Sequence, residues 1–208
     1  MGIPERKRKE KEARVELIKK TARVFFNEKG YKATKMEDVA IAAEISKATI
    51  YQYFKSKDDL FYEMMKERFE RLNQQVIMIH EKNDDPVRTL MLITETTFEF
   101  SLTDSEIYHV VTEMKSPEYR KLLSEDKARH LKEIMVSNLQ QVELTIRDGI
   151  EKGIFRKVDP KVGSVILWNT FMGILKFQEN RLDEGKKDHR KSTLFTGIEW
   201  LIDSLKKI

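Results

Sequence analysis

Apolar residues recur every three or four positions along almost the whole chain, which is the spacing of the buried side of an α-helix. The alternation of apolar and polar residues that is typical of a half-buried strand is missing. Glycine and proline interrupt the helical pattern at Gly30, Pro86, Gly153 and Pro160. The sequence therefore predicts an all-α protein with about nine or ten helices and no internal repeat.

Two segments of the helical pattern are ambiguous, whereas the others predict single helices. Residues 6–12 carry too much charge to pack, and they are predicted to be a mobile arm or a frayed helix start. The pattern over 122–152, after a restart at Ser116-Pro117, fits one long helix or two consecutive ones. The other helices are expected over residues 13–29, 34–43, 46–54, 57–81, 86–102, 105–113, 161–180 and 193–206.

Two capping signals lie close together in the first quarter of the chain. Thr34 and Glu37 fit the S/T-x-x-E capping box, which predicts that a helix starts at Thr34. Ser46 is expected to cap the next helix, in which Ile50 and Phe54 lie four positions apart and anchor one face. The opposite, outer surface of that helix is predicted to carry Lys47, Ala48, Thr49, Tyr51, Gln52 and Tyr53.

The outer surface of this helix has the chemistry of a DNA-reading element. A cation, two tyrosines and an amide suit phosphates, base edges and thymine methyl groups in a major groove, which admits a helix.

The distribution of charge along the chain supports DNA binding. Residues 1–57 hold 15 Lys/Arg against 8 Asp/Glu, a balance of +7, whereas residues 58–208 hold 24 against 27, a balance of −3. A polyanion-binding segment joined to a near-neutral remainder would show this asymmetry, although a solvated face alone could also produce it.

Composition narrows the class of protein. Cysteine is absent, which excludes disulfides, thiolate catalysis and zinc sites built on cysteine, and agrees with a reducing, cytoplasmic location. Polar residues interrupt the longest apolar stretch, Val162 to Phe177, and it is shorter than the roughly 20 residues of a membrane span. No signal peptide is visible. We expect a cytoplasmic protein without membrane association and without a cofactor.

An enzyme or a helical-bundle metalloprotein with no DNA role is the competing class. Glu106 and His109 form a Glu-x-x-His pattern, but di-iron bundles need two copies and two further carboxylates. Only one copy exists, so we expect His109 to be a pocket or interhelical residue, and no metal site. No nucleophile with a matching base is apparent, so no catalytic residue is expected. A third class, an interaction module without DNA binding, would be favoured if Glu44 prevented the turn.

The sequence from Thr34 onward resembles the N-terminal domain of the TetR (tetracycline-repressor-like) family of transcriptional regulators. The resemblance covers the helix that begins at Thr34, the turn Glu44-Ile45, the run Ser-Lys-Ala-Thr-Ile-Tyr-Gln-Tyr-Phe and the following Lys-Ser-Lys-Asp-Asp-Leu-Phe. The layout around Gly-Ile-Phe-Arg at 153–156 and Asp159-Pro160 is similar to the family's second domain. The resemblance implies a helix-turn-helix DNA-binding domain with a basic arm over 1–56, and an effector-binding and dimerisation domain over 57–208. It also implies a ligand-responsive repressor that binds a palindromic operator as a homodimer.

The resemblance and the helical geometry together assign roles to the DNA-binding residues. Phosphate contacts are expected from Thr34, Tyr53 and Lys57. Base edges are within reach of Lys47 and Gln52, while Thr49 and Tyr51 are expected to make thymine-methyl or phosphate contacts and Ala48 a close van der Waals contact. Where the family commonly has a glycine in the turn, this chain has Glu44. The turn would then need a left-handed non-glycine residue or another geometry.

The remaining helices are expected to hold an effector and a second copy of the chain. A small hydrophobic effector is expected to contact Phe69, Phe98, Tyr108, Met135, Trp168 and Met172. The dimer interface is expected on the last two helices, through Val165, Trp168, Met172, Phe177, Leu194, Ile198, Trp200, Leu201 and Leu205, with about half of these sealing the protomer's own core. Gly163, Gly173 and Gly197 would permit close approach of helices. The helix from Lys57 to Glu81 is expected to tilt when the effector binds and so to couple effector binding to DNA binding.

Overall fold

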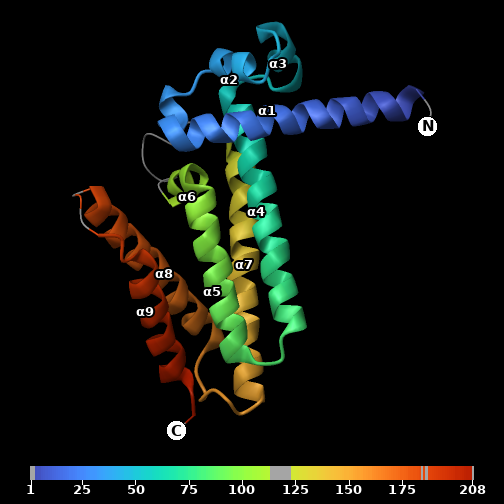
Figure 1. Ribbon diagram of the computed structural model, residues 1–208. Helices are drawn as coiled ribbons and strands as arrows, with labels where there is room; N and C mark the ends of the chain where they lie inside the picture. The colour runs from blue at the N-terminus through green and yellow to red at the C-terminus, as the bar shows by residue number, and fades with distance from the viewer. Residues whose placement is uncertain (1–2, 113–122, 184, 186, 208) are drawn as a thin grey trace. The chain divides into compact units, whose positions relative to one another are not determined.

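The computed structural model describes residues 3–112, 123–183, 185 and 187–207 (Figure 1). Within these ranges the chain is built of helices, and a single antiparallel bridge joins Phe155 to Lys206. The helices are α1 (Ile3–Ala33), α2 (Met36–Ala42), α3 (Lys47–Tyr53), α4 (Lys57–Lys82), α5 (Pro86–Thr103), α6 (Ser105–Thr112), α7 (Glu125–Glu151), α8 (Pro160–Asp183) and α9 (Arg190–Leu205). The all-α prediction is confirmed.

Most predicted helix boundaries agree with the structure to within a few residues. The long pattern over 122–152 forms one helix, α7, in its described part, whereas Ser116-Pro117 and the predicted helix end at Glu113 lie outside the described residues. Residues 6–12 form the continuous first turns of α1 rather than a mobile arm. No helix in the described ranges combines the length and apolar character needed to cross a membrane.

The chain divides into two compact units. The first unit comprises Met1–Arg68 and Ser101–Leu131, and the second comprises Phe69–Phe100 and Lys132–Ile208. Helices α4, α5 and α7 contribute residues to both units. This division follows packing, and the boundary after residue 56 stays a prediction about the DNA-binding domain.

The core of the first unit centres on an aromatic cluster between α1 and α4. Phe26 and Phe61 are buried and meet edge to face, with ring centroids 4.8 Å apart. Gly30 has φ +75°, a left-handed conformation that glycine adopts without steric cost, and it kinks α1 near its end. After this kink the ring of Tyr31 lies 5.0 Å from that of Phe61. The predicted stop at Gly30 therefore appears as a kink, followed by one further helical segment.

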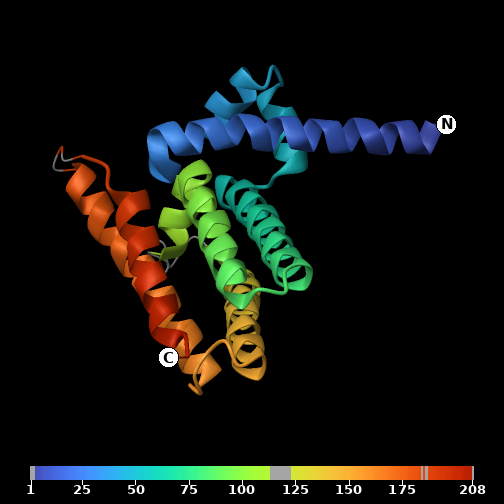
Figure 2. The same cartoon turned by 60° about the horizontal axis from the view of Figure 1, so that its bottom comes forward.

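The second unit is held together partly by the packing of α8 on α9, which lie side by side in both views (Figures 1 and 2). A Cβ atom on Gly197 would lie 2.9 Å from Ile174 Cδ1, so a larger residue there would have to displace the end of the Ile174 side chain. Phe98 meets Phe195 edge to face at 6.0 Å. The buried residues of α9 are Leu194, Ile198, Ile202 and Leu205.

Candidate nucleic-acid interface

Helices α2 and α3 are joined by a tight turn whose geometry depends on Glu44. Its φ of +55° is the only left-handed non-glycine value among the described residues. The Glu44 N–H donates to Ile41 O and the Ile45 N–H donates to Ala40 O, both at 3.0 Å. These two bonds make a Schellman motif, which usually has glycine at the left-handed position. The turn therefore forms with glutamate in the left-handed conformation, one of the two alternatives that the sequence analysis left open.

The capping box predicted at Thr34 is wrong. Helix α2 begins at Met36, and its N-cap residue is Lys35, whose side chain makes no capping hydrogen bond. Thr34 is buried, and its hydroxyl donates to the carbonyl of Gly30 at 2.9 Å. The kink at Gly30 leaves a carbonyl oxygen that needs a donor, and this local demand outweighs capping of the next helix. A phosphate contact by Thr34 stays a prediction.

The cap predicted at Ser46 is confirmed. Its hydroxyl oxygen accepts a hydrogen bond from the backbone N–H of Thr49 at 3.0 Å, so α3 begins at Lys47. Ile50 is fully buried and Phe54 is 4% exposed, as their spacing predicted. These contacts fix which side of α3 faces away from the core.

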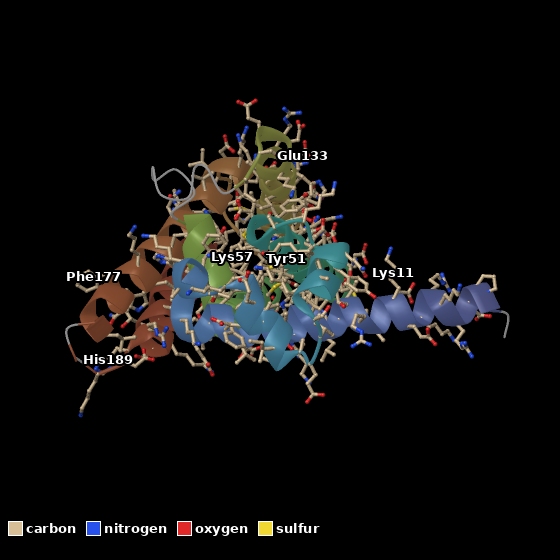
Figure 3. All side chains as sticks on the ribbon, turned by 90° about the horizontal axis from the view of Figure 1, so that it is seen from above. Lys11, Tyr51, Lys57, Glu133, Phe177 and His189 are labelled. Atoms are coloured by element: carbon tan, nitrogen blue, oxygen red, sulfur yellow. The ribbon has the colours of Figure 1, made fainter. Side chains whose placement is uncertain are left out.

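The outer surface of α3 presents the predicted DNA-reading residues. Lys47, Ala48, Tyr51 and Gln52 are exposed, whereas Thr49 and Tyr53 are half-buried. Figure 3 views this side of the molecule from above, with Tyr51 labelled. One short polar helix surface therefore carries an ammonium group, an amide and hydroxyl groups, which are donors suited to base edges and phosphates.

Lys47 is already paired in the absence of DNA. Its ammonium nitrogen lies 2.6 Å from Glu37 Oε1 on α2, and both side chains are exposed. This hydrogen bond lowers the pKa of Glu37 and raises the pKa of Lys47. Because water competes with an exposed ion pair, a phosphate or a base edge could replace the carboxylate. Glu37 thus contacts Lys47 across the helix-turn-helix instead of closing a capping box.

Lys57 occupies a different environment from the one its predicted phosphate contact implied. Its ammonium group donates to the carbonyl oxygens of Tyr31, Lys32 and Thr34 at 2.8, 3.1 and 3.0 Å. It also lies 4.3 Å from the centroid of the Tyr31 ring, a cation–π distance. Burial lowers the pKa of Lys57. An ammonium group has three donors, and all three are used by carbonyl oxygens in the last turn of α1 and at Thr34, just after it. A phosphate contact by Lys57 would therefore have to displace one of these bonds.

Tyr31, whose carbonyl oxygen accepts from Lys57, also makes hydrogen bonds to α4 and α6. The Tyr31 hydroxyl donates to the Asp58 carboxylate. Burial, followed by this hydrogen bond, raises the pKa of Tyr31 well above its ordinary value. The Tyr31 N–H donates to Glu106 Oε1 at 2.6 Å. The carboxylate of the Glu-x-x-His pattern therefore accepts a backbone hydrogen bond. Among the described residues, no group of three or more His, Cys, Asp or Glu side chains is arranged to hold a metal ion.

The second unit contains a cavity of about 40 Å³. Its three hydroxyl groups are bonded within their own helices: Thr94 to Leu90 O, Thr97 to Ile93 O, and Ser164 to Lys161 O. The cavity therefore offers mainly apolar surface. Its lining comprises Leu90, Ile93, Thr94, Thr97, Val142, Ser164, Leu167, Trp168, Phe171 and Ile198.

Only one of the six effector residues predicted from sequence, Trp168, lines this cavity. Phe69 packs on Phe100 and Phe98 on Phe195, while Tyr108 belongs to the first unit. The other two predicted residues, Met135 and Met172, are partly exposed and stand outside the lining. Helical spacing distinguished core-facing residues from surface residues, but it could not indicate which core residues border a void.

Comparison with known proteins agrees with this geometry. Residues 18–64 match the sequence model of bacterial regulatory proteins of the tetR family. The chain is 27% identical over 169 residues to the uncharacterized HTH-type transcriptional regulator YhgD of Bacillus subtilis, covering 78% of this chain and 82% of that protein. It is 32% identical over 84 residues to IcaR of Staphylococcus aureus, a negative transcriptional regulator of a biofilm operon, covering 40% of this chain and 44% of IcaR.

A solved structure extends the comparison to the whole fold. The transcriptional regulator FadR of Bacillus subtilis, crystallised with stearoyl-CoA, superposes with a TM-score of 0.68 at 19% identity and covers 91% of this chain and 98% of that chain. The helix-turn-helix with its exposed polar α3 defines a DNA-binding transcriptional regulator. Residues 18–64 thus match the DNA-binding segment of the tetR family, and the chain shares the fold of solved TetR-family regulators.

Proposed function

We propose that this protein is a repressor that binds an inverted-repeat operator as a homodimer and is released by a small hydrophobic effector, without enzymatic activity. The observation that carries the proposal is the outer surface of α3, where Lys47, Gln52 and Tyr51 are exposed beside a correctly capped turn. Repression is favoured by the relationship to IcaR, a negative regulator. Base edges would be read by Lys47 and Gln52, and phosphates held by Thr34, Tyr53 and Lys57.

The proposed dimer interface is the outer surface of α8 and α9. Trp200 is 72% exposed and Phe177 is 59% exposed. Val162, Val165 and Ile166 add exposed apolar surface on α8. Large exposed apolar side chains on neighbouring helices mark a surface that a partner covers. A second copy of the chain is the partner that fits best, because an operator with two-fold symmetry is bound by a two-fold protein.

The proposed effector site is the apolar cavity in the second unit. Its volume of about 40 Å³ is far below the roughly 300–1,000 Å³ of typical ligand pockets. Effector binding would therefore have to open the packing of α5 against α7, α8 and α9, and Trp168 would move with it. FadR, which was crystallised with stearoyl-CoA, makes a fatty acyl thioester a suitable first compound to test.

Helix α4 is the proposed connection between effector and DNA. It begins at Lys57, which is bonded to α1 in the first unit, and its residues from Phe69 onward belong to the second unit. A ligand that favours one arrangement of α4 would change operator affinity, and linkage requires operator to change ligand affinity by the same factor, typically about 5- to 150-fold. Equal effector affinities with and without saturating operator would contradict this connection.

The proposed function is tested by titrating the full chain with a random-sequence duplex at low and high salt. We expect binding that weakens steeply as salt rises, because phosphate contacts release counterions. Lys47→Ala and Gln52→Ala should leave this non-specific binding largely intact and change which sequences are preferred. A chain that binds no duplex at low salt would contradict DNA binding altogether.

A further inference from the structure

The first turns of α1 form a helical arm that makes no part of the core. Every side chain from residue 4 to residue 14 is exposed, and the first buried residue of α1 is Ile18. At a rise of 1.5 Å per residue the arm is about 15 Å long. Figure 1 shows it projecting from the part of α1 that lies beside α2 and α3, and Figure 3 labels Lys11 on it. Because no described residue buries the side chains of the arm, core packing does not explain its composition.

The charges of the arm fall into two groups. The arm has six basic residues and three glutamates. Three of the basic residues are paired one turn away, as Arg6–Glu10 at 3.4 Å, Arg8–Glu12 at 3.8 Å and Lys9–Glu5 at 3.9 Å. The other three, Lys7, Lys11 and Arg14, have no ion-pair partner within the part of the chain that the structure describes. The glutamates therefore neutralise one set of cations and leave the other set unpaired.

The three unpaired cations lie on one side of the helix. Their spacing of four and three residues places Lys7, Lys11 and Arg14 in one stripe, and the same spacing continues to Ile18 and Ala22, two of the buried residues of α1. We call Lys7, Lys11 and Arg14 the basic stripe. Glu5 and Glu12 lie on the opposite side of the helix. The basic stripe thus continues, toward the N-terminus of α1, the side on which the buried residues of α1 lie.

We propose that the basic stripe contacts backbone phosphates of duplex DNA beside the site read by α3. The proposal rests on the proposed DNA-binding function and extends its contact surface beyond residues 18–64, the segment that matches the family. Unpaired, exposed cations are complementary to phosphate, and contacts of this kind are independent of sequence. The arm holds only Pro4 and Ala13 as apolar side chains, whereas a helix that binds a membrane surface needs large apolar residues opposite its charges. Charge and composition therefore favour DNA over an anionic membrane.

Two triple variants of the full chain test this inference with the same change in net charge. The first is Lys7→Ala with Lys11→Ala and Arg14→Ala, and the second, the control, is Arg6→Ala with Arg8→Ala and Lys9→Ala. Alanine has the highest helix propensity and all six positions are exposed, so both variants should fold, which circular dichroism and thermal melting check. The probe is a random-sequence duplex, titrated across a salt series.

The stripe variant should bind the duplex about tenfold more weakly and lower the salt slope by about 2 to 3, since each phosphate contact contributes about 0.9. The control variant should change the slope by less than about 1. If both variants change binding equally, or neither does, while the wild type binds duplex, the inference is wrong and the proposed function stands. Loss of binding to anionic vesicles, with duplex binding unchanged, would also overturn it. A wild type that binds no duplex would refute the proposed function itself.

Discussion

The ammonium group of Lys57, the first residue of α4, lies over the ring of Tyr31 and donates to its carbonyl oxygen at 2.8 Å. The carbonyl oxygens of Lys32, in the last turn of α1, and of Thr34, just after it, accept from the same nitrogen. The carbonyl end of a helix carries partial negative charge, so a cation is favoured there. This contact joins α4 to the end of α1 next to the helix-turn-helix.

We predict that Lys57→Met, which keeps the length of the side chain but removes its charge and donors, destabilises the protein by about 1.5–3 kcal/mol, the range for hydrogen bonds that involve a charged group. Urea denaturation measures this loss, and Lys55→Met, at an exposed neighbouring position, is the control. If Lys57 also contacts a phosphate, the salt slope of duplex binding falls by about one unit. An unchanged denaturation midpoint would show that the contact with α1 contributes nothing.

Glu44→Gly should stabilise the protein by about 1 kcal/mol, because the left-handed conformation costs a residue with a Cβ atom roughly 1–2 kcal/mol. Glu44→Gln removes the charge and keeps the strain, so it separates the two effects. Both variants should bind duplex DNA more tightly, since a carboxylate beside the phosphates is gone, but only the glycine variant should melt at a higher temperature. Equal melting temperatures for the two variants would contradict the strain.

Glu37→Gln should strengthen binding to duplex DNA. The substitution removes the carboxylate that accepts from Lys47 at 2.6 Å and leaves the ammonium group available to the nucleic acid. Lys47→Ala should weaken binding to the preferred sequence, and the double variant should resemble Lys47→Ala. Fluorescence anisotropy with a labelled duplex measures all three. Additive effects of the two substitutions would show that Glu37 acts on DNA independently of Lys47.

Trp200→Glu should convert the protein to a folded monomer and weaken operator binding. The indole is 72% exposed in a single protomer, so the substitution leaves the protomer's own core intact. Val24→Glu, at an exposed apolar position on α1, is the matched control and should remain dimeric. Sedimentation equilibrium at micromolar protein distinguishes the two states. A wild type that sediments as a monomer would refute the proposed interface.

Sequence reasoning identified those parts of the fold that local rules determine. The cap at Ser46 and the buried pair Ile50 and Phe54 follow from spacing within one turn. For Glu44 the sequence left two possibilities, a left-handed residue or another turn geometry, and the structure shows the first. The capping box at Thr34 failed because the kink at Gly30 gave that hydroxyl a different acceptor. Whether the Thr34 hydroxyl caps α2 or binds the Gly30 carbonyl depends on where the folded chain places that carbonyl oxygen. The sequence alone does not determine this position.

Contacts between segments that lie far apart in the sequence could not be predicted either. Lys57 follows Tyr31 by 26 positions, and no local pattern distinguishes an ammonium group that binds carbonyl oxygens from one that would bind phosphate. The same holds for the cavity, since the spacing of Thr94 and Thr97 marks a core-facing stripe without showing that the core is incompletely filled there. Three of the nine apolar residues expected at the dimer interface, Leu194, Ile198 and Leu205, are buried in the second unit's own core.

Selection of bound sequences from a random duplex pool by the full-length protein tests the central claim most directly. We predict enrichment of an inverted repeat whose half-sites lie about 34–36 Å apart, or a multiple of that distance, as two recognition helices in successive major grooves require. Gln52→Ala should change the enriched bases within each half-site. A pool without enrichment, or a single asymmetric half-site bound by one protomer, would contradict the claim that α3 reads an operator from a homodimer.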